Sequence, residues 1–391
     1  MAKIVFLTSR FPYPLDKGDK LRVFHQLRSL AERDEVHLIS LSRWQPEPEH
    51  LQAVKQICTS VHNFVLPLPQ RLLAVALSPF RQIPLQVAYF YNRRIARSIR
   101  QLIADIQPDH IHSHLIRTTE YVKDMGSIPR TLDYMDAFGL GIDKRQQIER
   151  NPLKNLLFRY EKAMLYKYET RAFTYADRHC IISRQDQKAI RTTANDSIEI
   201  VANGVDLDRF YPRPAEKRYD LVFMGNMAYP PNVVAVSFLV EKILPLVHAQ
   251  RPETNVLIAG INPTKKVRSL ASGRVDVIPH FDDISDSIAM SRIMVTPMQI
   301  SIGLQNKIIQ AMAMKVPCLA STSCNLALGA EPGRQILLAD APEEYCQAIL
   351  ALLSDPDQYR EIAEAGYQFV IHQYSWPIQN EKLRALIHTS P

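Results

Sequence analysis

Short apolar runs alternate with helical patterns along most of the chain, and this alternation restricts the fold more than any other feature of the sequence. In the first half the strand-like runs are Ile4–Leu7, Val36–Leu41, His110–His112, Arg178–Ile182 and Ile198–Val201. Helical patterns around residues 22–33 and 95–106 stand between them. Apolar strands separated by amphipathic helices are typical of a parallel sheet that is covered by helices on both faces.

The same pattern starts again after Phe210. A polar, proline-containing joint at 212–218 leads into the runs Leu221–Met224, Val256–Ile258, Val275–Ile278, Ile293–Thr296 and Cys318–Ala320. The chain has 391 residues, more than the roughly 250–300 residues at which a single core stops growing. The sequence therefore predicts an α/β protein with two Rossmann-like domains, residues 1–205 and 206–374, that face each other across a cleft.

Several features favour a reduced, cytoplasmic protein. No run of about 18 apolar residues occurs, so no transmembrane helix is expected. The segment Met1–Leu7 resembles a first strand more than a signal peptide. The five cysteines are irregularly spaced and form no CxxC pair, so we expect buried thiols and neither disulfides nor a metal site.

The positive charge of the chain is concentrated in one window. Formal net charge is +7, and no acidic residue stands between Glu49 and Asp105. That window holds Lys55, Arg71, Arg81, Arg93, Arg94, Arg97 and Arg100, interleaved with apolar and aromatic residues. Such a mixture suits an anionic membrane surface, although a solvated helix face would have the same composition. No nucleic-acid motif accompanies the charge, so we expect no nucleic-acid partner.

Polar side chains follow the strand-like runs of the first half. The loop 14–20 contains Gly18 and Asp19 ahead of a helix whose amino end favours an anion, although a plain strand-to-helix turn has the same appearance. In His110–His114 the three histidines share one strand face, and we expect the last, His114, to hydrogen-bond a ligand hydroxyl or phosphate. A metal site is the alternative there, but no cluster of carboxylates or cysteines supports it.

Two aspartates follow the next apolar stretch. Asp133 and Asp136 are candidates for binding an acceptor hydroxyl or for acting as a general base. Both side chains also suit a simpler role, because aspartate commonly caps the segment that follows it.

In the second half, two segments suit a phosphate group. Gly225 and Asn226 end a strand, and a glycine there lets backbone amides approach a phosphate closely. The segment 301–313 places a glycine-containing loop before a helix, with Lys307 in its first turn and Gln310 one turn further along the same face. An ordinary capped amphipathic helix is the alternative. The sequence has neither GxGxxG nor a P-loop motif.

Taken together, these motifs resemble bacterial family-4 retaining glycosyltransferases of the GT-B fold, of the type found with exopolysaccharide export systems. The resemblance covers nearly the whole chain. It rests on Phe11–Arg22 (FPYPLDKGDKLR), Asp109–His114, Asn203–Asp206, Phe223–Asn232 and, most specifically, Gly303–Pro317 (GLQNKIIQAMAMKVP). Ser375-Trp376 before the final helix also fits the family.

The resemblance implies roles for individual residues. It places Gly18 near the donor phosphates or the acceptor, and His114 near the transferred sugar. Gly303, Leu304 and Gln305 would offer backbone contacts to the sugar or the diphosphate. Residues 1–205 would be the acceptor side, 206–374 would bind the nucleotide-sugar, and 375–391 would form a helix that returns to the N-terminal domain.

The sequence also departs from the family. The first acid of the paired-glutamate motif is replaced by Ile302, and the second, which holds the ribose, by Gln310. The arginine that normally follows the glycine at Gly225 is absent, because Asn226 stands there. We expect Lys307 to supply the missing charge beside the diphosphate.

The implied reaction moves a sugar from a nucleotide-sugar to a lipid-linked or polysaccharide acceptor with retention. UDP-glucose is the expected donor, with Phe281 near the uracil base. The resemblance implies no divalent metal and no other cofactor, and a location at the cytoplasmic face of the plasma membrane. Two alternatives remain at this stage: a GT-B sugar-nucleotide epimerase or phosphorylase, and a degenerate non-catalytic scaffold disabled at Ile302 and Gln310.

Overall fold

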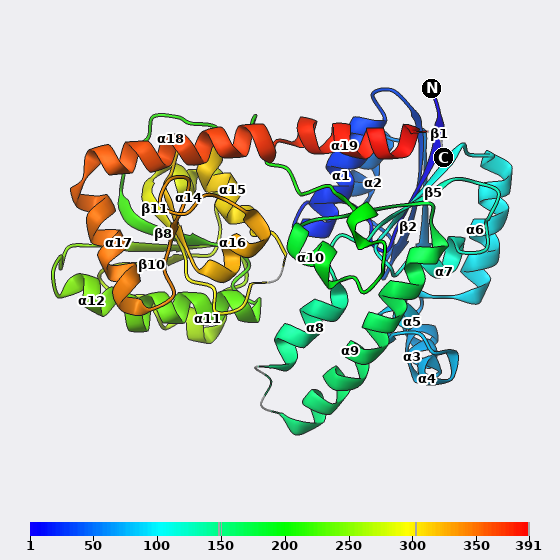
Figure 1. The fold of residues 1–391 in the computed structure, drawn as a ribbon, viewed down its shortest axis with the longest axis horizontal. Coiled ribbons are helices and arrows are strands. Elements are labelled where there is room, and N and C mark those ends of the chain that lie inside the picture. Colours follow the sequence, from blue (N-terminus) through cyan, green and yellow to red (C-terminus); the bar gives the residue numbers. More distant parts are fainter. Residues whose placement is uncertain (148, 150, 302, 390–391) are drawn as a thin grey trace. The chain divides into compact units, whose positions relative to one another are not determined.

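The computed structural model describes residues 1–147, 149, 151–301 and 303–389, and these form two compact units (Figure 1). The first unit contains Met1–Asn203 and Gln379–Pro391, and the second contains Gly204–Ile378. The last helix, α19 (Trp376–His388), begins in the second unit, and its residues from Gln379 onward belong to the first.

The first unit is built on a parallel seven-stranded sheet with the order β3-β2-β1-β4-β5-β6-β7. Its strands are β1 (Lys3–Thr8), β2 (Glu35–Ser42), β3 (Ser60–Val65), β4 (His110–His114), β5 (Arg130–Asp133), β6 (Arg178–Ile181) and β7 (Glu199–Ile200). Its helices are α1 (Gly18–Leu30), α2 (Pro48–Lys55), α3 (Leu68–Ala76), α4 (Ser78–Arg81), α5 (Leu85–Phe90), α6 (Arg93–Ile106), α7 (Thr119–Val122), α8 (Phe138–Gln146), α9 (Pro152–Ala172), η1 (Phe173–Tyr175), α10 (Arg184–Ala189) and η2 (Asn195–Ser197).

Strand β1 shows why the sheet is covered on both faces. Ile4 and Phe6 point into a cluster with α1 and with Leu383 of α19, whereas Val5 and Leu7 point into a cluster with α6. All four side chains are fully buried. A strand that is apolar at every position must bury both of its faces, which is the property that the sequence pattern indicated.

The second unit contains a parallel six-stranded sheet with the order β10-β9-β8-β11-β12-β13. Its strands are β8 (Tyr219–Met224), β9 (Val256–Ala259), β10 (Val275–Ile278), β11 (Ser291–Thr296), β12 (Cys318–Ala320) and β13 (Leu337–Leu338). Its helices are α11 (Pro230–Phe238), α12 (Leu244–His248), α13 (Lys265–Arg268), α14 (Ile284–Ala289), α15 (Asn306–Ala313), α16 (Thr322–Leu328), α17 (Pro342–Ser354) and α18 (Pro356–Gln373), with a π-helical turn at η3 (Leu239–Ile243) joining α11 to α12.

One helical run within the described part of the chain, Pro230–His248, is long and apolar enough to cross a membrane. Half of it is buried inside the second unit, where Val236, Leu239, Ile243 and Val247 are fully covered. The packing of this helix in the core of the second unit therefore explains its apolar composition.

Candidate functional site

In the second unit, two strands end in glycines whose backbones pack directly on each other. Gly225 follows β8 with φ 152°, and Gly260 follows β9 with φ 137°. A Cβ atom placed on Gly260 would lie 1.8 Å from the carbonyl oxygen of Gly225. Only glycine fits at this contact, so the carboxyl ends of β8 and β9 form a floor of bare backbone.

Lys307, the second residue of α15, points its ammonium group at this floor. A Cβ atom on Gly225 would lie 3.4 Å from Lys307 Nζ. The ammonium donates a hydrogen bond to Asn232 Oδ1 at 2.9 Å and lies 3.9 Å from the centre of the Phe223 ring. Lys307 is only 8% exposed. Among the described residues no carboxylate lies within ion-pair distance of it, and burial lowers its pKa to about 7.

Asn232 holds this arrangement together. Its Nδ2 group donates to the carbonyl oxygen of Asn226 at 3.0 Å, and its Oδ1 accepts from Lys307. The structure thus brings together three predicted residues, Gly225, Asn226 and Lys307. Sequence reasoning missed Asn232 as a member of the site. The available signal was a polar residue in the first turn of a helix, α11, that is otherwise almost wholly apolar.

The loop before α15 contains the other predicted contacts of this domain. Gly303 has φ 63°, Leu304 is buried, and Gln305 is the N-cap residue of α15, with its Nε2 group 3.2 Å from Ser301 Oγ. Gln310 is partly exposed on the same helix. Because the first amides of a helix have no acceptor within the helix, this end of α15 presents donors and a positive dipole. Ile302, the replaced glutamate, lies outside the described residues.

Phe281 lies in a different part of the second unit. It lines an open hollow together with Arg213, His280 and Asp286. Arg213 donates to the Asp286 carboxylate at 2.5 Å, so the charges in this hollow are already paired. The expected contact of Phe281 with a base therefore remains a prediction.

In the first unit, strand register aligns three polar side chains at the carboxyl end of the sheet. Thr8 of β1 is paired with His114 of β4, and His114 is paired with Asp133 of β5. Asp133 is fully buried and forms a two-pronged ion pair with Arg22 of α1, at 2.7 Å and 3.1 Å. This pair holds the pKa of Asp133 well below its usual range. Asp133 is thus engaged in holding α1 to the sheet and is unsuited to act as a base.

His114 is buried at the end of β4. Its Nδ1 atom lies 3.5 Å from Thr8 Oγ1, whereas its Nε2 atom has no hydrogen-bond partner among the described residues. Burial lowers the pKa of His114 to about 4, so the ring is neutral near pH 7. A neutral imidazole with an open nitrogen can donate to or accept from a hydroxyl group.

Asp136 lies just beyond β5, where the backbone is unusual. Met135 before it has φ 58°, and Leu115, after β4, has φ 68°. Left-handed backbone at non-glycine residues is costly and often marks functional sites. Burial, with repulsion from Asp186, raises the pKa of Asp136 above that of an ordinary aspartate. Its carboxyl group therefore holds a proton more readily than an exposed aspartate does.

The predicted loop residues Gly18 and Asp19 form the first turn of α1, which begins earlier than the helical pattern suggested. Asp19 accepts a 2.6 Å hydrogen bond from Arg10. Among the described residues, no group of three or more His, Cys, Asp or Glu side chains is placed to hold a metal ion. His110 is instead bound to Thr131 at 2.8 Å.

Comparison with known proteins bears on both units. Residues 218–355 match the family model described as glycosyl transferases group 1. The whole chain is 22% identical over 396 residues to an uncharacterized 44.6 kDa protein in the cps region of Klebsiella pneumoniae, covering 96% of this chain and 97% of that one.

Two further relatives extend this result. A GDP-mannose-dependent monoacylated alpha-(1-6)-phosphatidylinositol monomannoside mannosyltransferase of Corynebacterium glutamicum is 25% identical over 221 residues, 50% of this chain and 57% of its own. The crystal structure of Anabaena HepE in complex with UDP superimposes with a TM-score of 0.69 at 14% identity, covering 98% of each chain. The chain therefore has the GT-B fold, and the comparisons support a glycosyltransferase.

Proposed function

We propose that this protein transfers a sugar from a nucleoside-diphosphate sugar to a saccharide acceptor, with retention, in the synthesis of a surface polysaccharide. The observation that carries the proposal is Lys307. A buried ammonium group with no carboxylate partner among the described residues, facing bare backbone and the amino end of a helix, is arranged to receive an anion. A diphosphate supplies that anion.

The proposed chemistry requires few reactive side chains. The acceptor hydroxyl oxygen forms a bond to the anomeric carbon as the bond from that carbon to the diphosphate oxygen breaks. The hydroxyl proton passes to the leaving diphosphate, on the same face of the sugar. Lys307 and the amides at the start of α15 would stabilise the charge that develops on the diphosphate, and fixed electrostatic groups of this kind often contribute more to catalysis than any other effect.

For the first unit we propose two supporting roles. His114, neutral and with an open Nε2, would hydrogen-bond a hydroxyl of the transferred sugar. Asp136, whose pKa is raised by burial and by repulsion from Asp186, would bind the acceptor hydroxyl and offer a second route for its proton. We further propose that the reaction needs no divalent metal, because Lys307 and the helix dipole would neutralise the diphosphate.

UDP is the proposed nucleotide, and UDP-glucose the proposed donor. Support comes from the fold shared with Anabaena HepE, whose structure contains UDP. The mannosyltransferase of Corynebacterium glutamicum is named as GDP-mannose-dependent, which makes GDP the natural alternative. Gln310 would hydrogen-bond the ribose in place of the family's glutamate.

The proposal is tested by calorimetric titration of the purified protein with UDP and GDP in the absence of metal. Micromolar binding of UDP alone supports a UDP-sugar transferase, and transfer or hydrolysis of UDP-glucose follows as the assay of activity. Binding of GDP alone retains the enzyme class and changes the donor. Binding of neither nucleotide overturns the proposal in favour of a non-catalytic scaffold, whereas isomerised sugar-nucleotide as product would indicate an epimerase.

A matched pair of variants locates the site. Gly303→Trp fills the space in front of α15 and should abolish UDP binding. Gly333→Trp is the control, because Gly333 has the same left-handed backbone, with φ 79°, and a Cβ atom placed there would have no atom within 4 Å. Equal loss in both variants would show that the effect is not specific to the proposed site.

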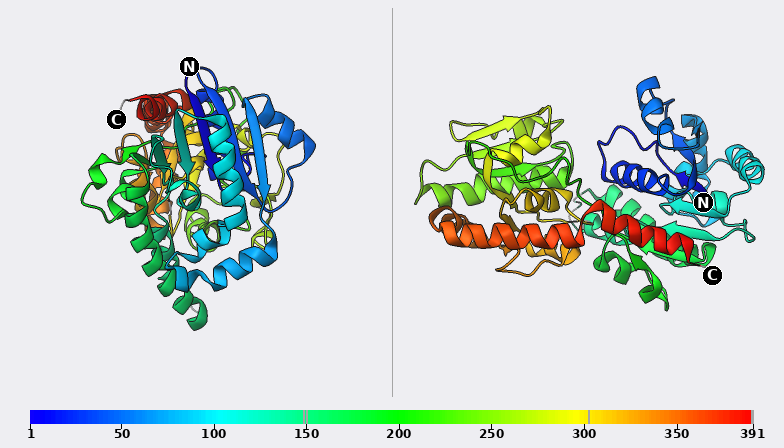
Figure 2. Two further views of the ribbon diagram at one scale, coloured as in Figure 1. Left: turned by 90° about the vertical axis from the view of Figure 1, so that its right-hand side faces the viewer. Right: turned by 90° about the horizontal axis from the view of Figure 1, so that it is seen from above.

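We also propose that the first unit attaches to an anionic membrane at the end formed by α3, α4 and the start of α9. Large apolar side chains are exposed there, and they are Leu68, Leu72, Leu73, Phe80, Leu153, Leu156 and Leu157. These helices lie at the same end of the unit (Figures 1 and 2). Only part of the sequence-predicted window contributes, since Val87 and Phe90 are buried.

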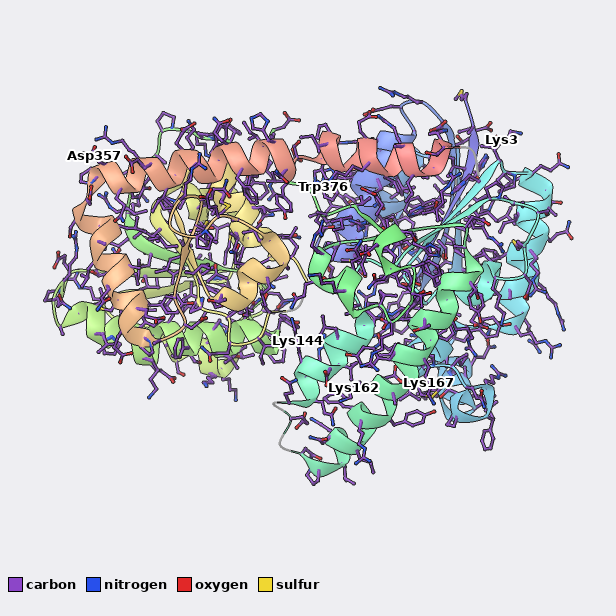
Figure 3. The ribbon with its side chains drawn as sticks, in the orientation of Figure 1. Lys3, Lys144, Lys162, Lys167, Asp357 and Trp376 are labelled. Carbon is purple, nitrogen blue, oxygen red and sulfur yellow. The ribbon has the colours of Figure 1, made fainter. Side chains whose placement is uncertain are left out.

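Basic groups accompany these apolar side chains. Leu73 and Leu77 share a hollow with Arg81, Arg93 and Arg94. Lys144, Lys162 and Lys167 add positive charge along the α8–α9 hairpin (Figure 3), and Lys162 is paired there with Asp143 at 2.8 Å. Apolar residues that insert and cations that contact lipid phosphates are together what stable attachment requires.

Sedimentation with vesicles tests this attachment. The protein should bind vesicles that contain phosphatidylglycerol and not vesicles of phosphatidylcholine alone. Leu153→Ser with Leu156→Ser should weaken binding several-fold, whereas Leu326→Ser, which changes an exposed leucine of the second unit, should not. Equal binding to both kinds of vesicle would refute the proposed surface. So would binding that is not weakened when Leu153→Ser and Leu156→Ser are combined.

A further inference from the structure

The loops that follow β1 and β2 enclose a pocket of about 420 Å³ in the first unit. It is lined by Arg10, Phe11, Tyr13, Lys17, Lys20, Ser42, Arg43, Trp44, Gln45, Pro46, Glu47, His50 and Phe90. The carboxyl ends of parallel strands are where open α/β sheets bind ligands, so the position of the pocket suits a binding site. None of its lining residues belongs to the glycosyl transferases group 1 domain.

Positive charge dominates this pocket. Arg10 is paired with Asp19 at 2.6 Å, and Lys20 is paired with Asp16 at 2.8 Å. Lys17 and Arg43 also line it, and within the described chain no carboxylate lies at ion-pair distance from either. Glu47 also lines the pocket and lies 3.8 Å from His50, so the lining keeps an excess of positive charge, from Lys17 and Arg43, that is available to an anionic ligand.

An exposed aromatic ring lies beside these cations. Trp44 is 79% exposed, although a tryptophan side chain normally buries most of its apolar surface. Tyr13 and His50 line the same pocket, with their ring centres 5.2 Å apart. A large flat ring at the edge of a pocket offers a surface on which the C–H face of a sugar ring can pack. Cations and an open ring together match a sugar that carries a negative charge.

We propose that this pocket binds an acidic sugar of the acceptor, with the sugar ring on Trp44 and its carboxylate or phosphate on Arg43 and Lys17. The inference rests on the proposed transferase function and adds the class of acceptor. Arg43 lies over the Tyr89 ring, at 5.6 Å from its centre, so a neutral glycan would leave both cations without a negative counter-charge, whereas an anionic one supplies it. A uronate carboxylate and a sugar phosphate share this chemistry.

Direct binding to the full-length protein tests the proposal without any turnover. The probes are a disaccharide that ends in glucuronic acid, the corresponding disaccharide that ends in glucose, and glucose 1-phosphate. The acidic disaccharide should bind at least ten-fold more tightly than the neutral one, and the preference should diminish as salt rises. Tighter binding of glucose 1-phosphate that Arg43→Gln weakens would identify the anion as a phosphate. Equal affinity for acidic and neutral disaccharides would overturn the proposal.

Single changes separate the two parts of the pocket. Arg43→Gln should weaken binding of the acidic disaccharide about ten-fold and leave the neutral one unchanged, whereas Trp44→Ala should weaken both. Arg28→Gln removes an exposed arginine of α1 that does not line the pocket, and it should have no effect. If Arg43→Gln and Arg28→Gln behave alike, the pocket does not select the charge.

UDP binding, measured on the same samples, distinguishes failure of this inference from failure of the proposed function. UDP should bind the Arg43 and Trp44 variants as it binds the unchanged protein. Normal UDP binding with no preference for acidic disaccharides would remove the acceptor inference and leave the transferase intact. Loss of UDP binding in the Arg43 or Trp44 variants would assign the pocket to the donor and overturn the inference.

Discussion

Replacing Lys307 with methionine should weaken UDP binding and stabilise the unliganded protein at the same time. The two effects have one cause, because the ammonium group is buried without a carboxylate partner among the described residues and burial lowers its pKa to about 7. Methionine has a similar length and carries no charge. The variant therefore removes the group that would contact the diphosphate and also removes the cost of burying it.

The size of each effect follows from the surroundings of Lys307. A hydrogen bond to a charged group contributes about 1.5–3 kcal/mol, so Lys307→Met should weaken UDP binding roughly 10- to 150-fold at pH 7. A fall in the Lys307 pKa from 10.5 to about 7 corresponds to a cost of up to about 5 kcal/mol for the charged form, at about 1.36 kcal/mol per unit. The lost hydrogen bond from this charged group to Asn232 offsets about 1.5–3 kcal/mol of the gain.

The pH dependence provides an independent readout. Because the folded pKa lies below that of an unfolded lysine, the unfolded chain binds more protons between pH 7 and 10.5, and stability should rise with pH over this window. Binding of the diphosphate favours the ammonium form, so UDP affinity should fall roughly 50-fold from pH 7 to pH 9. The terminal phosphate of UDP, with a pKa of about 6, stays ionised throughout.

Calorimetry at pH 7, 8 and 9, with thermal unfolding at pH 6, measures these quantities. Lys307→Met should bind UDP weakly at every pH and unfold at a higher temperature than the unchanged protein at pH 6. Lys266→Met is the matched control, because Lys266 is exposed on α13 of the same unit. Unchanged UDP affinity in Lys307→Met, or a pH dependence that persists in it, would refute the assignment of Lys307 to the diphosphate.

Four further outcomes are expected. Asp133→Ala should lower the free energy of unfolding in urea by about 3–5 kcal/mol, because it leaves the Arg22 charge buried without its carboxylate. The double change Arg22→Met, Asp133→Leu should recover most of that loss, and failure to recover it would argue against the ion pair as the cause. Gly260→Ala should prevent UDP binding, since its Cβ would meet the oxygen of Gly225, and normal binding would contradict this packing. Gln310→Glu should tighten UDP binding several-fold, because a charged acceptor strengthens a hydrogen bond to ribose, and weaker binding in calorimetry would disprove that contact. Transfer activity should change less than about two-fold in EDTA, and a larger loss that Mg²⁺ restores would refute metal independence.

The order of strands and helices was largely readable from the sequence. The runs Val36–Leu41 and Val256–Ile258 lie inside β2 and β9, because continuous apolar stretches bounded by polar loops have few other ways to be buried. Strand β3 was missed, since all six of its residues are only partly buried and SVHNFV shows neither an apolar run nor clear alternation. Helix α1 begins at Gly18, where no side chain caps it and the usual start signal is absent.

The sequence by itself also identified most of the residues that the second unit gathers around the end of β8. Gly225, Asn226 and Lys307 stand at strand and helix ends, and the chemistry of such ends is local. The tertiary structure alone decided that Asn232 joins them, and that no described carboxylate lies beside Lys307. It also placed the Arg22 side chain against Asp133, which lies 111 residues away along the chain. Ion pairs form between groups that are close in space, and the sequence alone does not show which distant residues the folded sheet brings together.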